Sequence, residues 1–133
     1  MERAKLNLPK YISFYRLALC NLTNSAIEKG DLRQAEDYFE DLEKSLESKE
    51  DQAPILFYTR ARLWFSRLRE CQIPIGSTEF REEIEKIWIE RNSMFEANKK
   101  IGPKSKSTIK KYKKLSDEIL NYAKSQNIHF IKL

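Results

Sequence analysis

The sequence predicts an all-α fold of five helices arranged in antiparallel hairpins. The 133-residue chain contains only 3 Gly and 4 Pro, too few breakers for many short strands joined by turns. Its apolar residues recur at steps of three and four, which is the period of an amphipathic helix. Hydrophobic residues make up 41% of the chain, enough to build a core in one domain spanning residues 1–133.

The first helix is expected from about Pro9 to Lys29. Proline suits a first helical turn, where its missing N–H would have had no partner. Gly30 ends this helix, because glycine enters the left-handed region at little cost. The predicted packed face carries Ile12, Tyr15, Leu19, Leu22 and Ala26.

Asp31 is expected to cap a second helix, with Gln34 completing a capping box. A polar stretch at 48–52 then leads to a third helix, from about Ala53 to Glu70. This third helix is apolar over more than half its circumference, which is typical of a helix packed between others. The second helix has an acidic outer face made of Glu36, Asp37, Glu40, Asp41 and Glu43.

Ser77 or Thr78 caps a fourth helix, and Gly102-Pro103 ends it. A basic loop, about 99–107, leads to a fifth helix, and an apolar tail at 128–133 is expected to dock on the body. The predicted buried residues of the fourth helix are Phe80, Ile84, Ile87, Trp88, Met94 and Phe95. Those of the fifth, about Thr108 to Ser125, are Ile109, Tyr112, Leu115, Ile119, Tyr122 and Ala123.

No motif indicates catalysis, so we expect no enzyme activity, no cofactor and no metal site. The single histidine, His129, lies near the C-terminus, and no glycine-rich phosphate loop or nucleophile motif occurs. Cys20 and Cys71 stand in apolar patterns and are expected to be buried free thiols. No signal-peptide pattern and no apolar run of membrane-spanning length occurs, so a cytoplasmic location without membrane contact is the default expectation.

The span from Leu19 to Leu46 resembles a tetratricopeptide repeat, a pair of antiparallel helices of about 34 residues. The resemblance lies in the junction, where Gly30 and Asp31 are followed by Ala35 and Phe39 at the expected spacing. Thr23 stands where the family prefers Gly or Ala. The resemblance implies a right-handed stack of hairpins, with an irregular second pair and a final helix that closes the end. The plain alternative is an irregular helical bundle.

The run from Ile27 through Phe65 resembles the C-terminal helical-repeat domain of Rgg/MutR-type peptide-sensing transcription regulators. Those regulators also carry an N-terminal helix-turn-helix domain, which has no counterpart in this sequence. The resemblance implies a short peptide bound along the first helix of each pair. Asn21 and Asn24 would then offer amides to the peptide backbone, and Arg62 and Arg69 would meet a peptide carboxylate.

Positive charge gathers in the C-terminal quarter. Residues 99–133 hold ten lysines and two acids, a net of +8, whereas residues 1–98 carry a net of −3. This run offers a possible anion-binding surface for nucleic acid, with an ordinary solvated helix face as the alternative. The candidate residues are Lys110, Lys111, Lys113 and Lys114.

The leading hypothesis is therefore a non-enzymatic protein- or peptide-binding module that serves as the sensing domain of a bacterial transcription regulator. Two alternatives remain open. One is a nucleic-acid-associated helical protein that acts through the lysine run. The other is a structural subunit that completes a larger helical assembly or a homo-oligomer, because a helix that is apolar over most of its circumference favours association.

Overall fold

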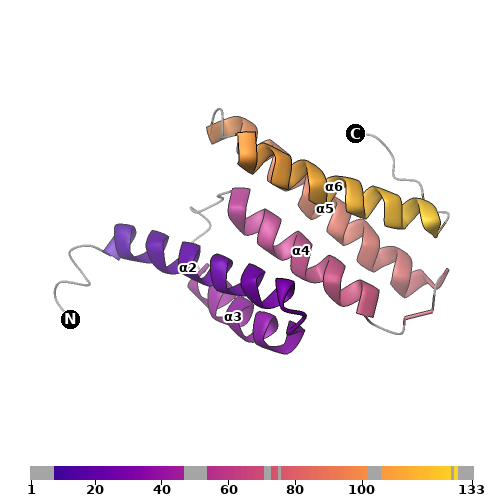
Figure 1. Ribbon diagram of the computed structural model, residues 1–133, viewed down its shortest axis with the longest axis horizontal. Coiled ribbons are helices and arrows are strands. Elements are labelled where there is room, and N and C mark those ends of the chain that lie inside the picture. Colours follow the sequence, from indigo (N-terminus) through magenta and orange to yellow (C-terminus); the bar gives the residue numbers. More distant parts are fainter. Residues whose placement is uncertain are drawn as a thin grey trace. The chain divides into compact units, whose positions relative to one another are not determined.

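The computed structural model describes residues 8–46, 54–70, 73–74, 76–101, 106–126 and 128. The helices of this part are α2 (Leu8–Glu28), α3 (Leu32–Ser45), α4 (Pro54–Glu70), α5 (Thr78–Ile101) and α6 (Lys106–Ser125) (Figure 1). The described residues contain no β-strand, which confirms the all-α prediction. None of these helices combines the length and the apolarity that crossing a membrane requires.

The chain divides into two compact units, where the sequence predicted one domain. The N-terminal unit is Met1–Asp51 and contains α2 and α3; the C-terminal unit is Gln52–Leu133 and contains α4, α5 and α6. Each unit is described below by itself.

In the N-terminal unit, α2 and α3 pack along each other and are joined by a tight reversal at Gly30 (Figure 1). Gly30 has a φ of 78°, in the left-handed region that glycine enters readily. Its N–H donates to the Ile27 carbonyl at 3.0 Å, and the Asp31 N–H donates to the Ala26 carbonyl at 2.9 Å. These two bonds define a Schellman motif, so the predicted glycine stop is confirmed.

Asp31 caps α3 as predicted, but the capping box is only half formed. The Asp31 carboxylate accepts a hydrogen bond of 3.1 Å from the Gln34 N–H. The Gln34 side-chain amide donates to the Tyr38 hydroxyl at 3.3 Å, and its oxygen does not accept from the Asp31 N–H as a full capping box requires. The physical reason is competition, since the Asp31 N–H already closes the end of α2 on the Ala26 carbonyl.

The packed face of α2 differs from the prediction. Leu19 and Ala26 are buried, but Tyr15 and Leu22 are 40% and 43% exposed. Thr23 is buried as well, and Cys20 is a buried free thiol, as predicted. Periodicity does not reveal which side of a helix packs when apolar residues occupy both sides. The side chain of Ile12 and all of Cys71 lie outside the described part.

Two buried polar side chains of the N-terminal unit have hydrogen-bond partners, which lowers the free-energy cost of burying them. The Thr23 hydroxyl donates to the Leu19 carbonyl at 2.7 Å. The Arg16 guanidinium donates to the Ser45 hydroxyl at 3.2 Å and also to the Ser45 carbonyl. Ser45 is the last residue of α3, so the cation satisfies an orphan carbonyl and lies at the negative end of the helix dipole.

The exposed and buried sides of α3 match the sequence. Ala35, Phe39 and Leu42 form its buried face. The predicted acidic face is exposed throughout, at Glu36, Asp37, Glu40, Asp41 and Glu43.

In the C-terminal unit, α4, α5 and α6 share one core. Its buried residues include Ala61, Phe65, Leu68, Phe80, Ile84, Ile87, Met94, Tyr112, Leu115, Ile119 and Ala123. The predicted Trp88, Phe95 and Tyr122 pack on its margin, as does Ile128 of the tail. Residues 129–133, including His129, lie outside the described part.

Ile109 was predicted to be buried and is 44% exposed. It precedes the buried Ile119 by ten residues, which places it about 80° round the helix from that side chain. It therefore lies on the flank of α6 rather than in the core stripe.

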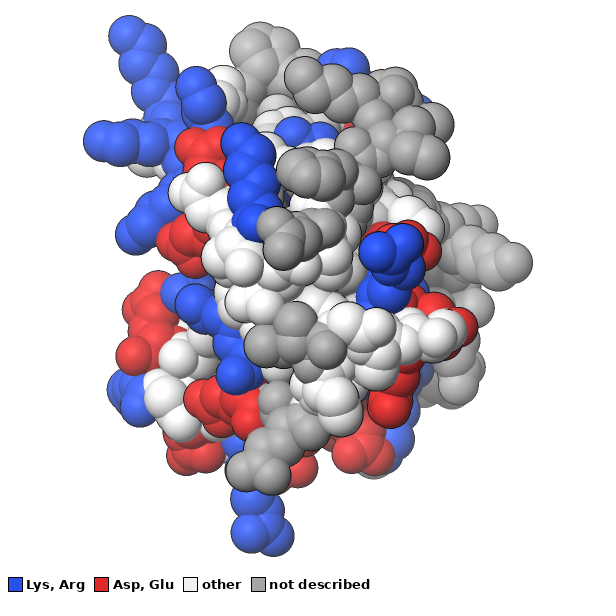
Figure 2. All heavy atoms as spheres, turned by 90° about the vertical axis from the view of Figure 1, so that its right-hand side faces the viewer, with Lys and Arg blue, Asp and Glu red and all other residues white. Residues whose placement is uncertain are grey.

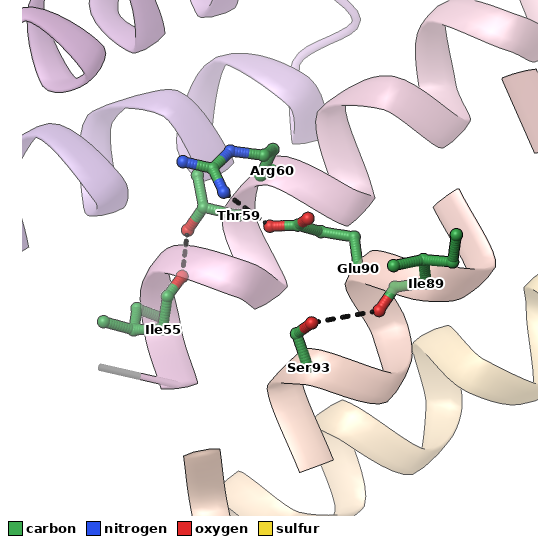
Figure 3. A network of polar contacts seen from close by, with 6 residues as sticks. All are labelled: Ile55, Thr59, Arg60, Ile89, Glu90 and Ser93. Carbon is green, nitrogen blue, oxygen red and sulfur yellow. Dashed lines mark hydrogen bonds and ion pairs between the residues drawn. The ribbon is translucent and has the colours of Figure 1, made fainter. Parts of the chain in front are cut away.

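Polar links connect the helices of this unit. The Arg60 guanidinium of α4 donates to the Glu90 carboxylate of α5 at 2.7 Å, as Figure 3 shows. Arg91 of α5 donates through Nε to the Ser116 hydroxyl of α6 at 2.8 Å. Its Cζ lies 4.4 Å from the Trp88 ring centroid. Burial lowers the pKa of Arg91, while the charge of Asp117 acts in the opposite direction.

The ends of α5 and α6 correct two details of the prediction. Ser77 rather than Thr78 caps α5, because its hydroxyl accepts from the Phe80 N–H at 3.1 Å. The basic loop was predicted too long, since Lys99 and Lys100 lie in the last turn of α5 and Lys106 begins α6. Lysine is a good helix former, so lysines flanking a break extend the helices on either side.

Candidate functional site

Two exposed surfaces contain the residues that the sequence singled out. The first, here called the α2 surface, consists of Phe14, Leu17, Ala18, Asn21, Leu22 and Ser25. All six are exposed, and the three large apolar side chains are 61%, 44% and 43% exposed in chain order. Their spacing places them on one side of the helix. None of these six carries a charge, but the exposed Glu28 lies on the same side of α2, one turn beyond Ser25, so this side combines apolar area and hydrogen-bonding groups with one carboxylate at its end.

The two predicted asparagines separate on this helix. Asn21 is exposed in the middle of the α2 surface, where its amide is available as both donor and acceptor. Asn24 is only 7% exposed and lies toward the buried side. Of the pair, Asn21 is the one that a partner on the α2 surface would reach.

The second surface lies where α4 meets α6, above two aromatic pairs. Tyr58 pairs with Tyr112 at a centroid distance of 5.3 Å, and Phe65 meets Tyr122 edge-on at 5.5 Å. Residue numbers rise together in the two pairs, so α4 and α6 run in the same direction. The α4 rings are buried, with Tyr58 4% and Phe65 1% exposed.

Three cations lie over these α4 rings. Lys111 Nζ is 5.1 Å and Arg62 Cζ 6.0 Å from the centroid of Tyr58. Arg69 Cζ is 4.6 Å from the centroid of Phe65. The negative face of an aromatic ring attracts a cation within about 6 Å, so the rings help to position all three groups. We call Arg62, Arg69 and Lys111 the basic seam.

The basic seam joins two predictions that the sequence kept apart. Arg62 and Arg69 were predicted to meet a peptide carboxylate, and Lys111 was predicted as part of a separate anion-binding run. Lys110, Lys113 and Lys114, the other members of that run, are exposed on α6. Figure 2 shows one face of the molecule, where basic side chains gather toward the upper left and acidic ones are interspersed below.

The described residues contain no cluster of His, Cys, Asp or Glu side chains that could hold a metal ion. The candidate functional features of the described part are its two surfaces. One is largely apolar, on α2, and the other is cationic, on α4 and α6.

Sequence reasoning missed Phe14 and Leu17 as surface residues. The available signal was that they lie off the predicted packed stripe of a helix that is apolar on more than one side. The seam also left a signal, because Tyr58 and Arg62, like Phe65 and Arg69, are four residues apart. Lys111 reaches the Tyr58 ring only because of the register of α6 against α4. Local spacing in the sequence does not encode that register.

Comparison with known proteins adds no assignment, because no family model, no curated protein and no solved structure matches the chain.

Proposed function

We propose that the chain is a non-enzymatic protein- or peptide-binding module that holds its partner on the α2 surface. The observation that carries this proposal is the exposure of Phe14, Leu17 and Leu22 on one side of one helix, around the exposed amide of Asn21. Apolar area removed from water contributes roughly 25 cal/mol per Å². The amide would fix the direction and register of a bound backbone.

The architecture proposed with this function is a tetratricopeptide-like stack of antiparallel hairpins. The Schellman reversal at Gly30 supports it, as does the complete burial of Ala35 and Thr23, whose small side chains favour close approach of helices. In such a stack α2 is the first helix of its pair and lines the binding surface. The resemblance to Rgg/MutR-type regulators supports a role as the peptide-sensing domain of a bacterial transcription regulator.

A display selection of random peptides against the full chain tests the proposal. We expect the wild-type chain to enrich peptides with apolar anchors, and Leu17→Asn to weaken their affinity about tenfold or more, since burying a leucine contributes about 1.5–3 kcal/mol. Ile109→Asn is the matched control, because Ile109 is also 44% exposed but lies on α6. Failure to enrich any peptide, or equal losses in the two variants, contradicts the proposal.

A nucleic-acid-associated role is the second candidate, and the exposure of Lys110, Lys113 and Lys114 on α6 favours it. Binding through these lysines would weaken steeply with salt, because neutralised phosphates release counterions. Filter binding of an oligonucleotide should then be abolished by combining Lys110→Glu with Lys114→Glu, while peptide selection is unchanged. Oligonucleotide binding that is insensitive to salt, or that survives both substitutions, excludes this role.

A further inference from the structure

We propose that the basic seam is a second binding site, and that it takes the carboxylates of an acidic protein segment. The seam lies on α4 and α6, so this inference goes beyond the partner held on α2. It is carried by the convergence of cations from two helices over the same buried aromatic ring.

The aromatic rings hold the cations of the seam in positions that favour carboxylate binding. A guanidinium that lies over an aromatic face interacts with the ring through its own face, and its N–H groups still point outward from its edge. Arg69 Cζ lies over Phe65 at 4.6 Å from the ring centroid, a distance that allows such stacking. The edge of a guanidinium donates two parallel hydrogen bonds to one carboxylate. Positioning by the ring reduces the entropy lost when the carboxylate binds.

Two cations of the seam differ from cations elsewhere in the described part that are paired with carboxylates. Arg60 pairs with Glu90 and Lys99 pairs with Glu96. Among the described side chains, neither Arg69 nor Lys111 forms an ion pair with a carboxylate. Arg62 and Lys111 both lie within 6.0 Å of the Tyr58 centroid, so positive charge from α4 and α6 converges over one ring.

The seam also sets a spacing for its ligand. Arg62 and Arg69 are seven residues apart on α4, which corresponds to about 10.5 Å along the helix. Carboxylates seven residues apart on a helix, or about three apart in an extended chain, match this separation. An acidic segment with either spacing can therefore reach both guanidinium groups at once.

A protein carboxylate fits this site better than nucleic acid does. Tyr58 and Phe65 are 4% and 1% exposed, so their rings are not available for base stacking. Glu118 is exposed on α6 seven residues after Lys111, on the same side of that helix. Its charge would repel a continuous phosphate backbone that followed α6.

The experiment measures fluorescence anisotropy of a labelled glutamate-rich peptide with the full chain at low ionic strength. A peptide with glutamine in place of each glutamate and a single-stranded oligonucleotide serve as alternative probes. We compare the wild-type chain with Arg69→Gln combined with Lys111→Gln. The matched control is Lys113→Gln combined with Lys114→Gln, which removes the same charge from exposed positions outside the seam.

We expect the glutamate-rich peptide to bind and the seam variant to weaken it about tenfold or more, since hydrogen bonds to charged groups contribute about 1.5–3 kcal/mol each. The control should bind as the wild type does, and thermal unfolding should show that all variants remain folded. Equal losses in seam and control variants, binding of the glutamine peptide, or tighter binding of the oligonucleotide would each overturn the proposal. These outcomes leave the α2 surface untested, so the proposed function stands or falls separately.

Discussion

Gly30 shows how a single residue sets the reversal between α2 and α3. Its φ is 78°, and a Cβ placed on it would meet no heavy atom within 4 Å. Space is therefore not the constraint at this position. A side chain here would be opposed only by its own backbone conformation, because L-residues rarely enter the left-handed region.

We therefore predict that Gly30→Ala lowers the free energy of unfolding by about 1 kcal/mol, the usual cost of the left-handed region for a residue with a Cβ. Gly30→Asn should lose less, because asparagine enters this region more readily. Urea denaturation of the full chain measures both changes. Equal stability of Gly30→Ala and the wild-type chain would show that the reversal does not depend on glycine.

Local signals explain which single residues the sequence could predict. Gly30, Asp31 and Ser77 act within five residues of their own positions, so their roles follow from the sequence around them. The second half of the capping box could not be predicted in the same way. The Asp31 N–H that it needs already donates to the Ala26 carbonyl at the end of α2. Two overlapping local motifs therefore compete for one donor.

At the scale of elements, one partly buried ion pair adds to the hydrophobic core that joins α4 and α5. The side chains of Arg60 and Glu90 are 23% and 11% exposed (Figure 3). Removing one partner from such a pair leaves a poorly solvated charge, whereas replacing both with apolar groups costs far less. The pair therefore constrains which residues α4 and α5 can place opposite each other.

Arg60→Met should lower the free energy of unfolding by about 2 kcal/mol, since it leaves the Glu90 carboxylate without this partner. Adding Glu90→Leu should recover much of that loss. A double-mutant cycle by urea denaturation measures the coupling. Lys99→Met is the control, because the Lys99–Glu96 pair has side chains 76% and 67% exposed, and such pairs contribute about 0–1 kcal/mol. Additive losses in the cycle would show that Arg60 and Glu90 do not act together.

Helix positions were largely predictable, and helix faces were not always so. Breakers such as Gly30 and Gly76 separate the helices, and charged outer faces such as that of α3 leave one side to pack. On α2, apolar side chains surround the helix, so Tyr15 and Leu22 were assigned to the wrong side. The α2 surface was missed for this reason, since a helix that is apolar on two sides has one side left for another partner.

At the scale of the whole molecule, the chain divides into two compact units, and composition predicted one domain. Chain length and hydrophobic content limit how much core can form, but they do not say whether the core is continuous. The described core cluster is built from α4, α5 and α6, and α2 and α3 form a separate compact unit. The seam depends on tertiary register in the same way, because Lys111 meets Tyr58 across two helices that are far apart in the sequence.

Two units predict two levels of unfolding. Ile87 in α5 and Leu42 in α3 are both fully buried, and each lies in a different unit. Truncating a buried Ile or Leu to Ala costs about 2–5 kcal/mol, and the loss should accelerate local opening of the unit that contains it. Hydrogen exchange followed by mass spectrometry should show faster exchange in α4, α5 and α6 for Ile87→Ala, and in α2 and α3 for Leu42→Ala. If either substitution accelerates exchange equally in all five helices, residues 1–133 unfold as one cooperative domain. The division into units would then describe packing without describing stability.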